Sequence, residues 1–265
     1  MLFHRTVLRA ANSIFNFVVI SLLLIAGSYS AFALWDNERI YAAAGDVQAD
    51  MIKLKPEIEI TEEEGADFSE LLAVNPDVCG WITMDNTLVD YPILQGETNL
   101  TYINTDVYGN FALAGSIFLD SRNSREFTDT FSLIYGHHMA DSKMFGDLDL
   151  YKDQTFFNEN RTGSLILPNS AYNLDIIACL LVSASEDNIF EPTIWQDSNI
   201  SRFLNWTKQN ALHYHEDIMT ELENAKEPFR LLCLSTCSYE FTDARTIVLT
   251  VMRPYTSEEN GGLQE

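Results

Sequence analysis

The hydrophobic pattern divides the chain into an apolar N-terminal run and a longer body of short alternating segments. Residues 10–35 contain no charged side chain, and this length is sufficient for a helix to cross a hydrocarbon layer about 30 Å thick. Two arginines precede the run, and acidic residues follow it. Because positive residues stay on the cytoplasmic side, the pattern predicts a cytoplasmic N-terminus at 1–9, a transmembrane anchor at 10–35 and an exported body.

A cleavable signal peptide is the alternative interpretation of the apolar run. The small residues at 27–31 could form a cleavage site, although the apolar core of a signal peptide is normally shorter. Both interpretations predict that the body of the protein is exported.

The segment between the apolar run and the body is polar. Residues 36–67 predict a stalk or linker that is partly helical, with an acidic run from Glu57 to Glu64. An amphipathic segment, 68–74, predicts a short helix that ends at Asn75 and the following proline.

From residue 78 onward, short apolar segments alternate with turn residues. Eight segments have the composition of strands, and most of their connections favour antiparallel pairing in a closed barrel or sandwich. The predicted strands are 79–84, 88–94, 115–120, 130–135, 163–167, 172–185, 230–237 and 245–252. Helices are predicted at 144–151 and 200–213. The expected fold class is therefore mostly β with interleaved helices, in a domain at 68–256 followed by a polar tail at 257–265.

Composition narrows the possible functions of this body. Hydrophobic residues make up 46% of the chain, which indicates a globular rather than a disordered protein. The formal net charge is −23, from 39 acidic and 16 basic residues. Nucleic-acid binding needs a basic face, so the charge argues against it, and it also argues against docking of the body on an anionic membrane surface.

The four cysteines do not predict a disulfide scaffold. Cys233 and Cys237 lie on one predicted strand, where their Cα atoms would be about 13 Å apart, beyond the roughly 7 Å limit for a disulfide. Cys79 and Cys179 lie in apolar strand-like segments and are expected to be small core residues.

The end of one predicted strand and the start of the next place a cysteine near an arginine. Cys237 ends the segment 230–237, and Arg245 begins the following strand, so the two can meet across the turn. A nearby cation stabilises a thiolate, and a guanidinium can also hold an oxyanion. Cys233, which is flanked by leucines, is expected to be buried and inert.

The histidines differ in their contexts. His137 and His138 directly follow a predicted strand and a glycine, at the rim of the sheet, where imidazole can act as an acid, a base or a metal ligand. His213 and His215 end a predicted helix, where a favourable interaction with the helix C-terminus explains them. A zinc site from the two rim histidines and the two C-terminal cysteines is disfavoured, because adjacent histidines diverge and the cysteine pair lies on a strand.

Several spaced motifs resemble the sortase family, in particular its class B branch. The family's active-site strand pair resembles LSTCSYEF at 234–241 with DAR at 243–245. Its histidine region resembles IYGHHM at 134–139 with MFGDL at 144–148. Two framework motifs also match, YPILQG at 91–96 and AGSIFLD at 114–120. The resemblance runs from about residue 68 to residue 253.

The resemblance implies a membrane-anchored cysteine transpeptidase of a Gram-positive-type cell envelope, with an eight-stranded sortase barrel. Carried over by motif, Cys237 is the nucleophile, His137 the general acid and base, and Arg245 the oxyanion- and substrate-binding residue. His137 is chosen over His138 because the family histidine directly follows the glycine.

Two further positions resemble substrate contacts of the family, Asn99 and Ser235. The sequence departs from the family pattern at position 233, where the family's strand motif begins with a threonine and this chain has Cys233. The side chain at this position is expected to point inward, so the difference should have little consequence. Asp120, in a framework motif, is expected to hold the fold.

The implied reaction has two steps. The thiolate of Cys237 attacks the carbonyl of a threonine in a C-terminal sorting motif of an exported protein, and His137 protonates the leaving amine to give a thioester. An amine from a peptidoglycan precursor or a pilin then resolves the thioester, with His137 as base and Arg245 at the oxyanion. No metal or organic cofactor is needed. The expected location is the cell membrane, with a single span and an extracellular catalytic domain.

Two other functions are compatible with the residues. An exported cysteine peptidase of the cell envelope would only hydrolyse, but such enzymes usually place the cysteine before the histidine and on a helix. An anchored binding ectodomain with an acidic surface would have no activity. The sequence leaves open the sorting motif, the acceptor amine and whether the role is in iron uptake, pilus assembly or general surface display.

Overall fold

A single long helix, α1 (Leu2–Ile52), begins the protein in the computed structural model, which describes residues 2–57, 66–195, 200–237 and 243–255. The chain divides into two compact units, Met1–Ala43 and Ala44–Glu265. The first unit is helical, and its apolar stretch is long and apolar enough to cross a membrane and is not buried within the protein. The residues expected to form an anchor and a helical stalk are thus helical, as the sequence predicts.

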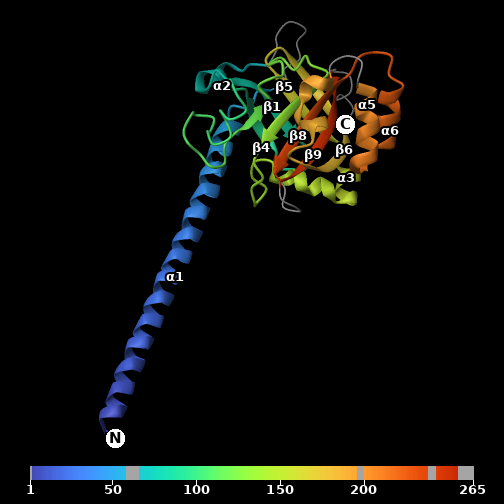
Figure 1. Ribbon diagram of the computed structural model, residues 1–265. Coiled ribbons are helices and arrows are strands. Elements are labelled where there is room, and N and C mark those ends of the chain that lie inside the picture. Colours follow the sequence, from blue (N-terminus) through green and yellow to red (C-terminus); the bar gives the residue numbers. More distant parts are fainter. Residues whose placement is uncertain (1, 58–65, 196–199, 238–242, 256–265) are drawn as a thin grey trace, which may run out of the picture. The chain divides into compact units, whose positions relative to one another are not determined.

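Eight strands of the second unit close into a barrel (Figure 1). The strands of the barrel are β1 (Val78–Met84), β2 (Asp90–Leu94), β3 (Ile117–Leu119), β4 (Phe131–Gly136), β5 (Thr162–Leu167), β6 (Ser170–Ser183), β8 (Arg230–Cys237) and β9 (Ala244–Pro254). They pair in the order β5-β1-β2-β3-β4-β8-β9-β6, and pairing of β5 with β6 closes the ring. The pairs β2–β3 and β4–β8 are parallel and the others antiparallel. The predicted eight-stranded barrel is confirmed.

The structure corrects the prediction for the segment around His213. Helix α5 (Ile200–Asn210) ends early, and the chain continues as β7 (Ala211–Tyr214), which pairs with β6 outside the ring. His213 lies in this strand, and His215 precedes α6 (Glu216–Glu223) and stacks on Phe157 with ring centroids 4.2 Å apart. Neither histidine therefore ends a helix. Pairing with β6 and burial of the His215 ring outweigh the local helical pattern.

Short helices connect the strands of the barrel. They are α2 (Ser69–Val74), α3 (Gln154–Glu159), α4 (Asp187–Phe190) and the 3-10 helices η1 (Gly146–Lys152) and η2 (Pro192–Trp195). The helix predicted over 144–151 is thus a 3-10 helix, and the helix predicted before Asn75 is α2. Figure 1 shows α5 and α6 side by side on one flank of the barrel.

Helices on this flank bury the outer face of the barrel strands. Trp195 and Phe203 pack in one core cluster with Cys233 and other residues of β4, β6, β8 and β9. Leu232 and Leu234, on the opposite face of β8, are also fully buried. A strand covered on both faces has a nearly continuous apolar sequence, which explains the run of leucines in β8.

The three cysteines whose side chains the structure describes are buried, as predicted. Cys179 and Cys233 are 0% exposed and Cys79 is 2% exposed. Burial raises the pKa of the Cys79 thiol to about 12, and it also raises the pKa of Cys233. A buried neutral thiol is a poor nucleophile, so these positions serve packing.

Candidate active site

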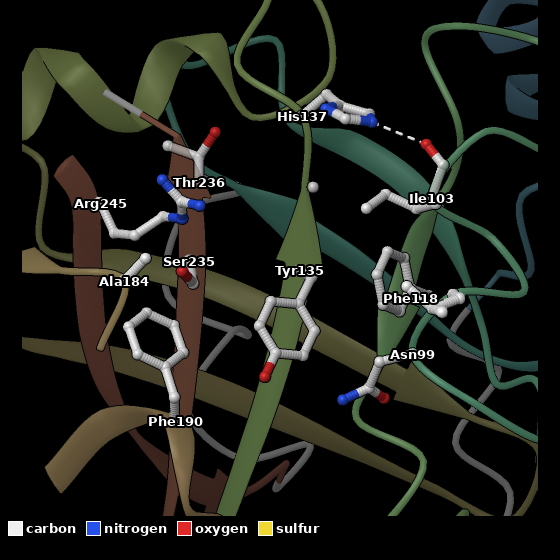
Figure 2. A pocket seen from close by; sticks show the side chains of 12 residues that line it. Asn99, Ile103, Phe118, Tyr135, His137, Ala184, Phe190, Ser235, Thr236 and Arg245 are labelled. Carbon is white, nitrogen blue, oxygen red and sulfur yellow. Dashed lines mark hydrogen bonds between the residues drawn. The ribbon is translucent and has the colours of Figure 1, made fainter. Parts of the chain in front are cut away.

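A groove with a cavity volume of about 510 Å³ lies at the C-terminal ends of the parallel strands β4 and β8 (Figure 2). Its apolar surface comes from Leu100, Ile103, Phe118, Tyr135, Ala184 and Phe190, and its polar surface from Asn99, His137, Ser235, Thr236 and Arg245. Four of the five site residues proposed from the sequence therefore line one cavity. The fifth, Cys237, directly follows Thr236, and its side chain lies outside the described residues.

Strand register places the backbone of the proposed catalytic residues at one end of three neighbouring strands. Cys237 and Arg245 are Cα partners in the antiparallel pair β8–β9. Gly136 pairs with Thr236 in the parallel pair β4–β8, so His137 leaves β4 at the level of Cys237. Directly opposed residues in a sheet lie about 5 Å apart, which is within the reach that a shared reaction centre requires.

The imidazole of His137 is held by the loop that precedes β3. Its Nε2 lies 2.6 Å from the carbonyl oxygen of Ile103 (Figure 2). A carbonyl only accepts, so Nε2 donates the proton in this contact. In the neutral ring this leaves Nδ1 unprotonated, and Nδ1 is then the nitrogen that can take up a proton.

The neighbouring His138 has a different environment. Its Nε2 lies 3.0 Å from Oδ2 of Asp149, and its side chain is 12% exposed. Asp149 also accepts a hydrogen bond from Thr246 on β9 at 2.7 Å and pairs with Lys152 at 3.0 Å. His138 does not line the groove. The two histidines therefore diverge, as the sequence predicts, and the geometry supports the choice of His137.

The loop after the histidines is constrained by close backbone approaches. A Cβ at Gly146 would lie 2.2 Å from the carbonyl oxygen of Met139, so only glycine fits there. The backbone N–H of Met144, a residue with φ of 53°, donates to the hydroxyl of Tyr91 at 2.8 Å. These contacts connect the histidine motif to the framework motif at 91–96.

Removing the charge of Asp149 should destabilise the protein at neutral pH. Burial raises the pKa of Asp149, but hydrogen bonds from His138, Thr246 and Lys152 outweigh it and lower the pKa from 3.8 to about 2. A carboxylate whose pKa is lower in the folded than in the unfolded chain stabilises the fold at pH values above its unfolded-state pKa. This stabilisation is lost as the pH falls through its folded-state pKa. We expect Asp149→Asn to lower the free energy of unfolding by about 2 kcal/mol at pH 7.

Denaturant unfolding at several pH values would measure this effect. The difference between the wild type and Asp149→Asn should shrink as the pH falls below about 4, near the unfolded pKa, and be largely lost near about 2, the folded pKa. Asp217→Asn is the control, because the side chain of Asp217 is 65% exposed and its ion pair should contribute little. A difference that stays constant with pH would contradict the role of the Asp149 charge.

Arg245 presents its guanidinium to the groove without an acidic partner among the described residues. Its Nη1 donates to the carbonyl oxygen of Ala244 at 2.9 Å. The remaining N–H groups of a guanidinium can bind a carbonyl or an oxyanion. The arrangement is therefore suited to hold a peptide and a developing negative charge.

Two buried hydroxyl groups beside the groove lack partners in the described part of the chain. They are Oγ of Ser235 and Oγ1 of Thr236, and both residues are 1% exposed. An unsatisfied buried hydroxyl costs about 1–3 kcal/mol, so a hydrogen bond from either group to a bound peptide would be stabilising. The resemblance pointed to Ser235 but not to Thr236. Its place directly before Cys237 was the available signal.

Asn99 lines the groove, but its amide is already engaged. Nδ2 donates to Oδ2 of Asp120 at 2.8 Å, and Oδ1 accepts from the backbone N–H of Ser121 at 2.7 Å. The side-chain amide thus has one N–H left for a ligand. In the parts of the chain that the structure describes, no group of three or more His, Cys, Asp or Glu side chains could hold a metal ion.

Comparisons with known proteins identify the family to which this closed barrel and its groove belong. No family model matches the chain. Sortase B of Listeria monocytogenes is 30% identical over 223 residues, which cover 84% of this chain and 88% of the relative. Sortase B of Staphylococcus aureus is 30% identical over 184 residues, which cover 69% of this chain and 72% of the relative.

Solved structures show the same similarity. Spy0129 of Streptococcus pyogenes, a class B sortase involved in pilus biogenesis, has 39% identity and a TM-score of 0.64 over 71% of this chain and 98% of its own. Sortase B of Bacillus anthracis in complex with AAEK1 has 26% identity and a TM-score of 0.70 over 82% of this chain and 99% of its own. The chain belongs to the sortase B family and is a cysteine transpeptidase. A sortase B–substrate complex of Staphylococcus aureus has 25% identity and a TM-score of 0.63 over 82% of this chain and 95% of its own.

Proposed function

We propose that Cys237, His137 and Arg245 are the catalytic residues of this sortase. The observation that carries the proposal is the strand register. In the pair β8–β9, Cys237 lies directly opposite Arg245. In the pair β4–β8, Gly136 lies opposite Thr236, so that His137 follows β4 beside Cys237. In the groove, His137 and Arg245 face a largely apolar surface that can hold an extended peptide.

The proposed first half-reaction forms a thioester. The sulfur of Cys237 attacks the carbonyl carbon of a threonine in the sorting motif, and the C–N bond after the threonine breaks. Arg245 donates hydrogen bonds to the oxyanion. His137 gives its proton to the leaving amine, so that charge and proton balance are kept.

The proposed second half-reaction transfers the acyl group to an amine. The amine, from a peptidoglycan precursor or a pilin, attacks the thioester carbonyl, and His137 accepts the amine proton while the Cys237 thiolate leaves. Spy0129, with 39% identity, is described as involved in pilus biogenesis, which supports including a pilin as acceptor. Asn99 and Ser235, together with Thr236, would contact the bound peptide.

The proposal extends to domain organisation and location. Residues 68–256 form the catalytic domain, 36–67 the linker and 257–265 a polar tail. Sortases are cell-envelope enzymes, and α1 supplies a candidate membrane helix. With two arginines before the apolar run, residues 10–35 span the membrane once, 1–9 stay in the cytoplasm and the groove is outside.

Capture of the acyl-enzyme from a peptide library tests this function. Peptides with a threonine at varied positions are incubated with the protein, and mass spectrometry identifies the residue that carries the acyl group. We expect a thioester on Cys237 that is released as an amide when a primary amine such as triglycine is added.

Two outcomes would contradict the proposal in different ways. Release of acid only, at a rate that triglycine does not change, would indicate the hydrolytic peptidase. Absence of any acyl-enzyme, with no thiol that reacts selectively with an alkylating reagent, would indicate the binding ectodomain.

A further inference from the structure

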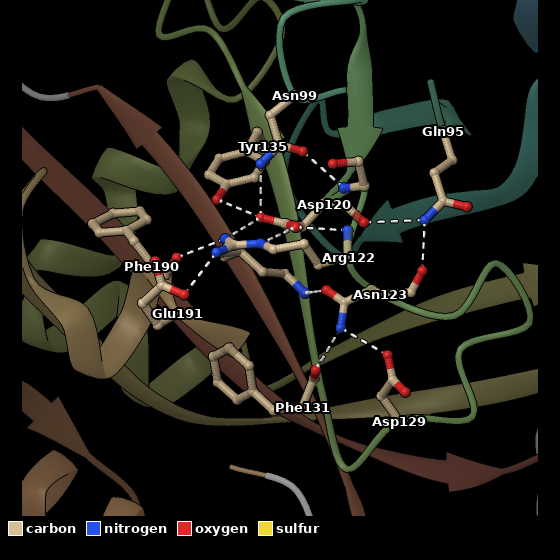
Figure 3. Close-up of polar contacts among 12 residues, drawn as sticks. Gln95, Asn99, Asp120, Arg122, Asn123, Asp129, Phe131, Tyr135, Phe190 and Glu191 are labelled. Carbon is tan, nitrogen blue, oxygen red and sulfur yellow. Dashed lines mark hydrogen bonds and ion pairs between the residues drawn. The ribbon is translucent and has the colours of Figure 1, made fainter. Parts of the chain in front are cut away.

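An ion pair between the buried Asp120 and the partly exposed Arg122 lies behind the groove wall and is not part of the proposed chemistry. Asp120, after β3, is 0% exposed and accepts two hydrogen bonds from Arg122, from Nε at 2.9 Å and from Nη2 at 2.8 Å. The backbone N–H of Arg122 donates to the same carboxylate at 2.9 Å. A bidentate arginine–carboxylate contact fixes the orientation of both groups (Figure 3).

The carboxylate of Asp120 also holds two residues that line the groove. Its Oδ2 accepts from Nδ2 of Asn99 at 2.8 Å and from the hydroxyl of Tyr135 at 2.9 Å. Asn99 belongs to the loop before β3, and Tyr135 belongs to β4. One buried acid therefore fixes two separate segments of the groove wall (Figure 3).

Arg122 extends this network to the opposite wall. Its Nη2 donates to the backbone carbonyl of Phe190 at 2.7 Å, and its Nη1 pairs with Glu191 at 2.8 Å. The ring of Phe190 lies parallel to the ring of Tyr135, with an interplanar angle of 13° and centroids 6.4 Å apart. Arg122 thus fastens the end of α4 at a fixed distance from β4.

The walls joined in this way are the apolar part of the groove. Phe190, Tyr135 and Phe118 present rings to it, and the rings of Phe118 and Tyr135 are also in contact, with centroids 5.3 Å apart. Figure 2 shows Phe190 and Tyr135 below the side chains of Arg245 and His137. The surface that these rings form suits an apolar side chain of a peptide whose carbonyl is near Arg245.

We propose that Asp120 and Arg122 are positioning residues that hold Phe190 against Tyr135 and so set the selectivity of the groove for an apolar side chain of the sorting motif. This inference rests on the proposed function of the groove. The pair does not touch the reacting atoms and acts through Phe190, Tyr135 and Asn99. Its loss should therefore weaken peptide capture more than it slows the chemical step.

Two variants separate the parts of the network. Glu191→Ala removes only the outer ion pair, whereas Arg122→Lys keeps a positive charge but lacks the fork that reaches Asp120, Phe190 and Glu191 together. Arg161→Lys is the matched control, because Arg161 pairs with Asp217 at 2.6 Å, is 39% exposed and does not line the groove.

The first measurement is hydrogen exchange of the backbone amides of 187–195, which needs no substrate. We expect faster exchange in this segment for Arg122→Lys, a smaller increase for Glu191→Ala and no change for Arg161→Lys. Unchanged exchange in Arg122→Lys would overturn the proposal, whatever the substrate proves to be.

The second measurement is steady-state cleavage of the peptide selected by acyl-enzyme capture. For Arg122→Lys we expect KM to rise about tenfold with kcat changed less than about twofold. Replacing the apolar residue of the peptide by alanine should lower kcat/KM by a larger factor for the wild type than for Arg122→Lys. Two results would overturn the selectivity role. One is a fall in kcat at constant KM for Arg122→Lys, and the other is an equal decrease in kcat/KM for the alanine peptide in both enzymes.

Failure of the proposed function has a different signature. If Cys237 is not the nucleophile, the wild type and Cys237→Ala cleave the peptide equally. The exchange of 187–195 and the KM of Arg122→Lys still report on the positioning pair in that case.

Discussion

Replacement of Cys237 by alanine will abolish thioester formation, and replacement of Cys233 will not. Without the sulfur there is no atom to carry the acyl group, so we expect peptide cleavage to fall by at least about ten-thousandfold. Cys233 is fully buried, and burial raises the pKa of its thiol, so it is neither accessible nor ionised at neutral pH. Mass spectrometry of the trapped acyl-enzyme and the rate of peptide cleavage measure both variants.

The Cys233→Ala variant is the control for the same strand. It should keep nearly normal cleavage but lose about 1–2 kcal/mol of unfolding free energy, because the side chain packs in the core cluster with Phe131 and Leu249. Cleavage that persists in Cys237→Ala and disappears in Cys233→Ala would show that the assignment of the nucleophile is wrong.

Arg245→Lys will lose most of the activity although it keeps the charge. A guanidinium offers several N–H donors in one plane, whereas an ammonium on a shorter reach cannot hold the oxyanion and the peptide together. Loss of one oxyanion donor typically lowers kcat by about a hundredfold to a thousandfold. We therefore expect a decrease of that size in single-turnover acylation, measured with the selected peptide at saturating concentration.

Arg253→Lys provides a matched control on the same strand. Arg253 also lies on β9, but it pairs with Asp175 and Glu221 and does not line the groove. Its replacement should leave acylation nearly unchanged. Near-normal acylation by Arg245→Lys would show that Arg245 does not bind the oxyanion through its guanidinium. Its contribution would then be that of a positive charge alone.

The strands, the anchor helix and the order of the chemical motifs could be predicted because each depends on neighbouring residues. Apolar segments between turn residues indicate strands, and all eight are present within a few residues of their predicted ends. The prediction failed around His213, where a helical pattern continues into β7. The contact of this segment with β6, more than thirty residues away, is not visible in a local window.

The candidate site was predicted in its residue types but not in its connections. The sequence placed His137 and His138 together, and the tertiary contacts of His137 with Ile103 and of His138 with Asp149 separate their environments. The resemblance pointed to Ser235 but not to Thr236, although both line the groove at the end of β8. The hydrogen bonds of Arg122 to Phe190 and Glu191 span 68 and 69 residues and had no signal in the sequence.

By itself, the sequence determined which segments of this sortase form strands, which run can span a membrane, and which residues can supply a thiolate, a proton and a cation. Those properties follow from side-chain chemistry and from periodicities of a few residues. The tertiary structure decided how the barrel closes through β5 and β6, which histidine faces the groove, and how one ion pair, Asp120 and Arg122, joins the two walls of that groove. These depend on contacts between distant segments, where the geometry of each hydrogen bond is set only once the whole barrel has formed.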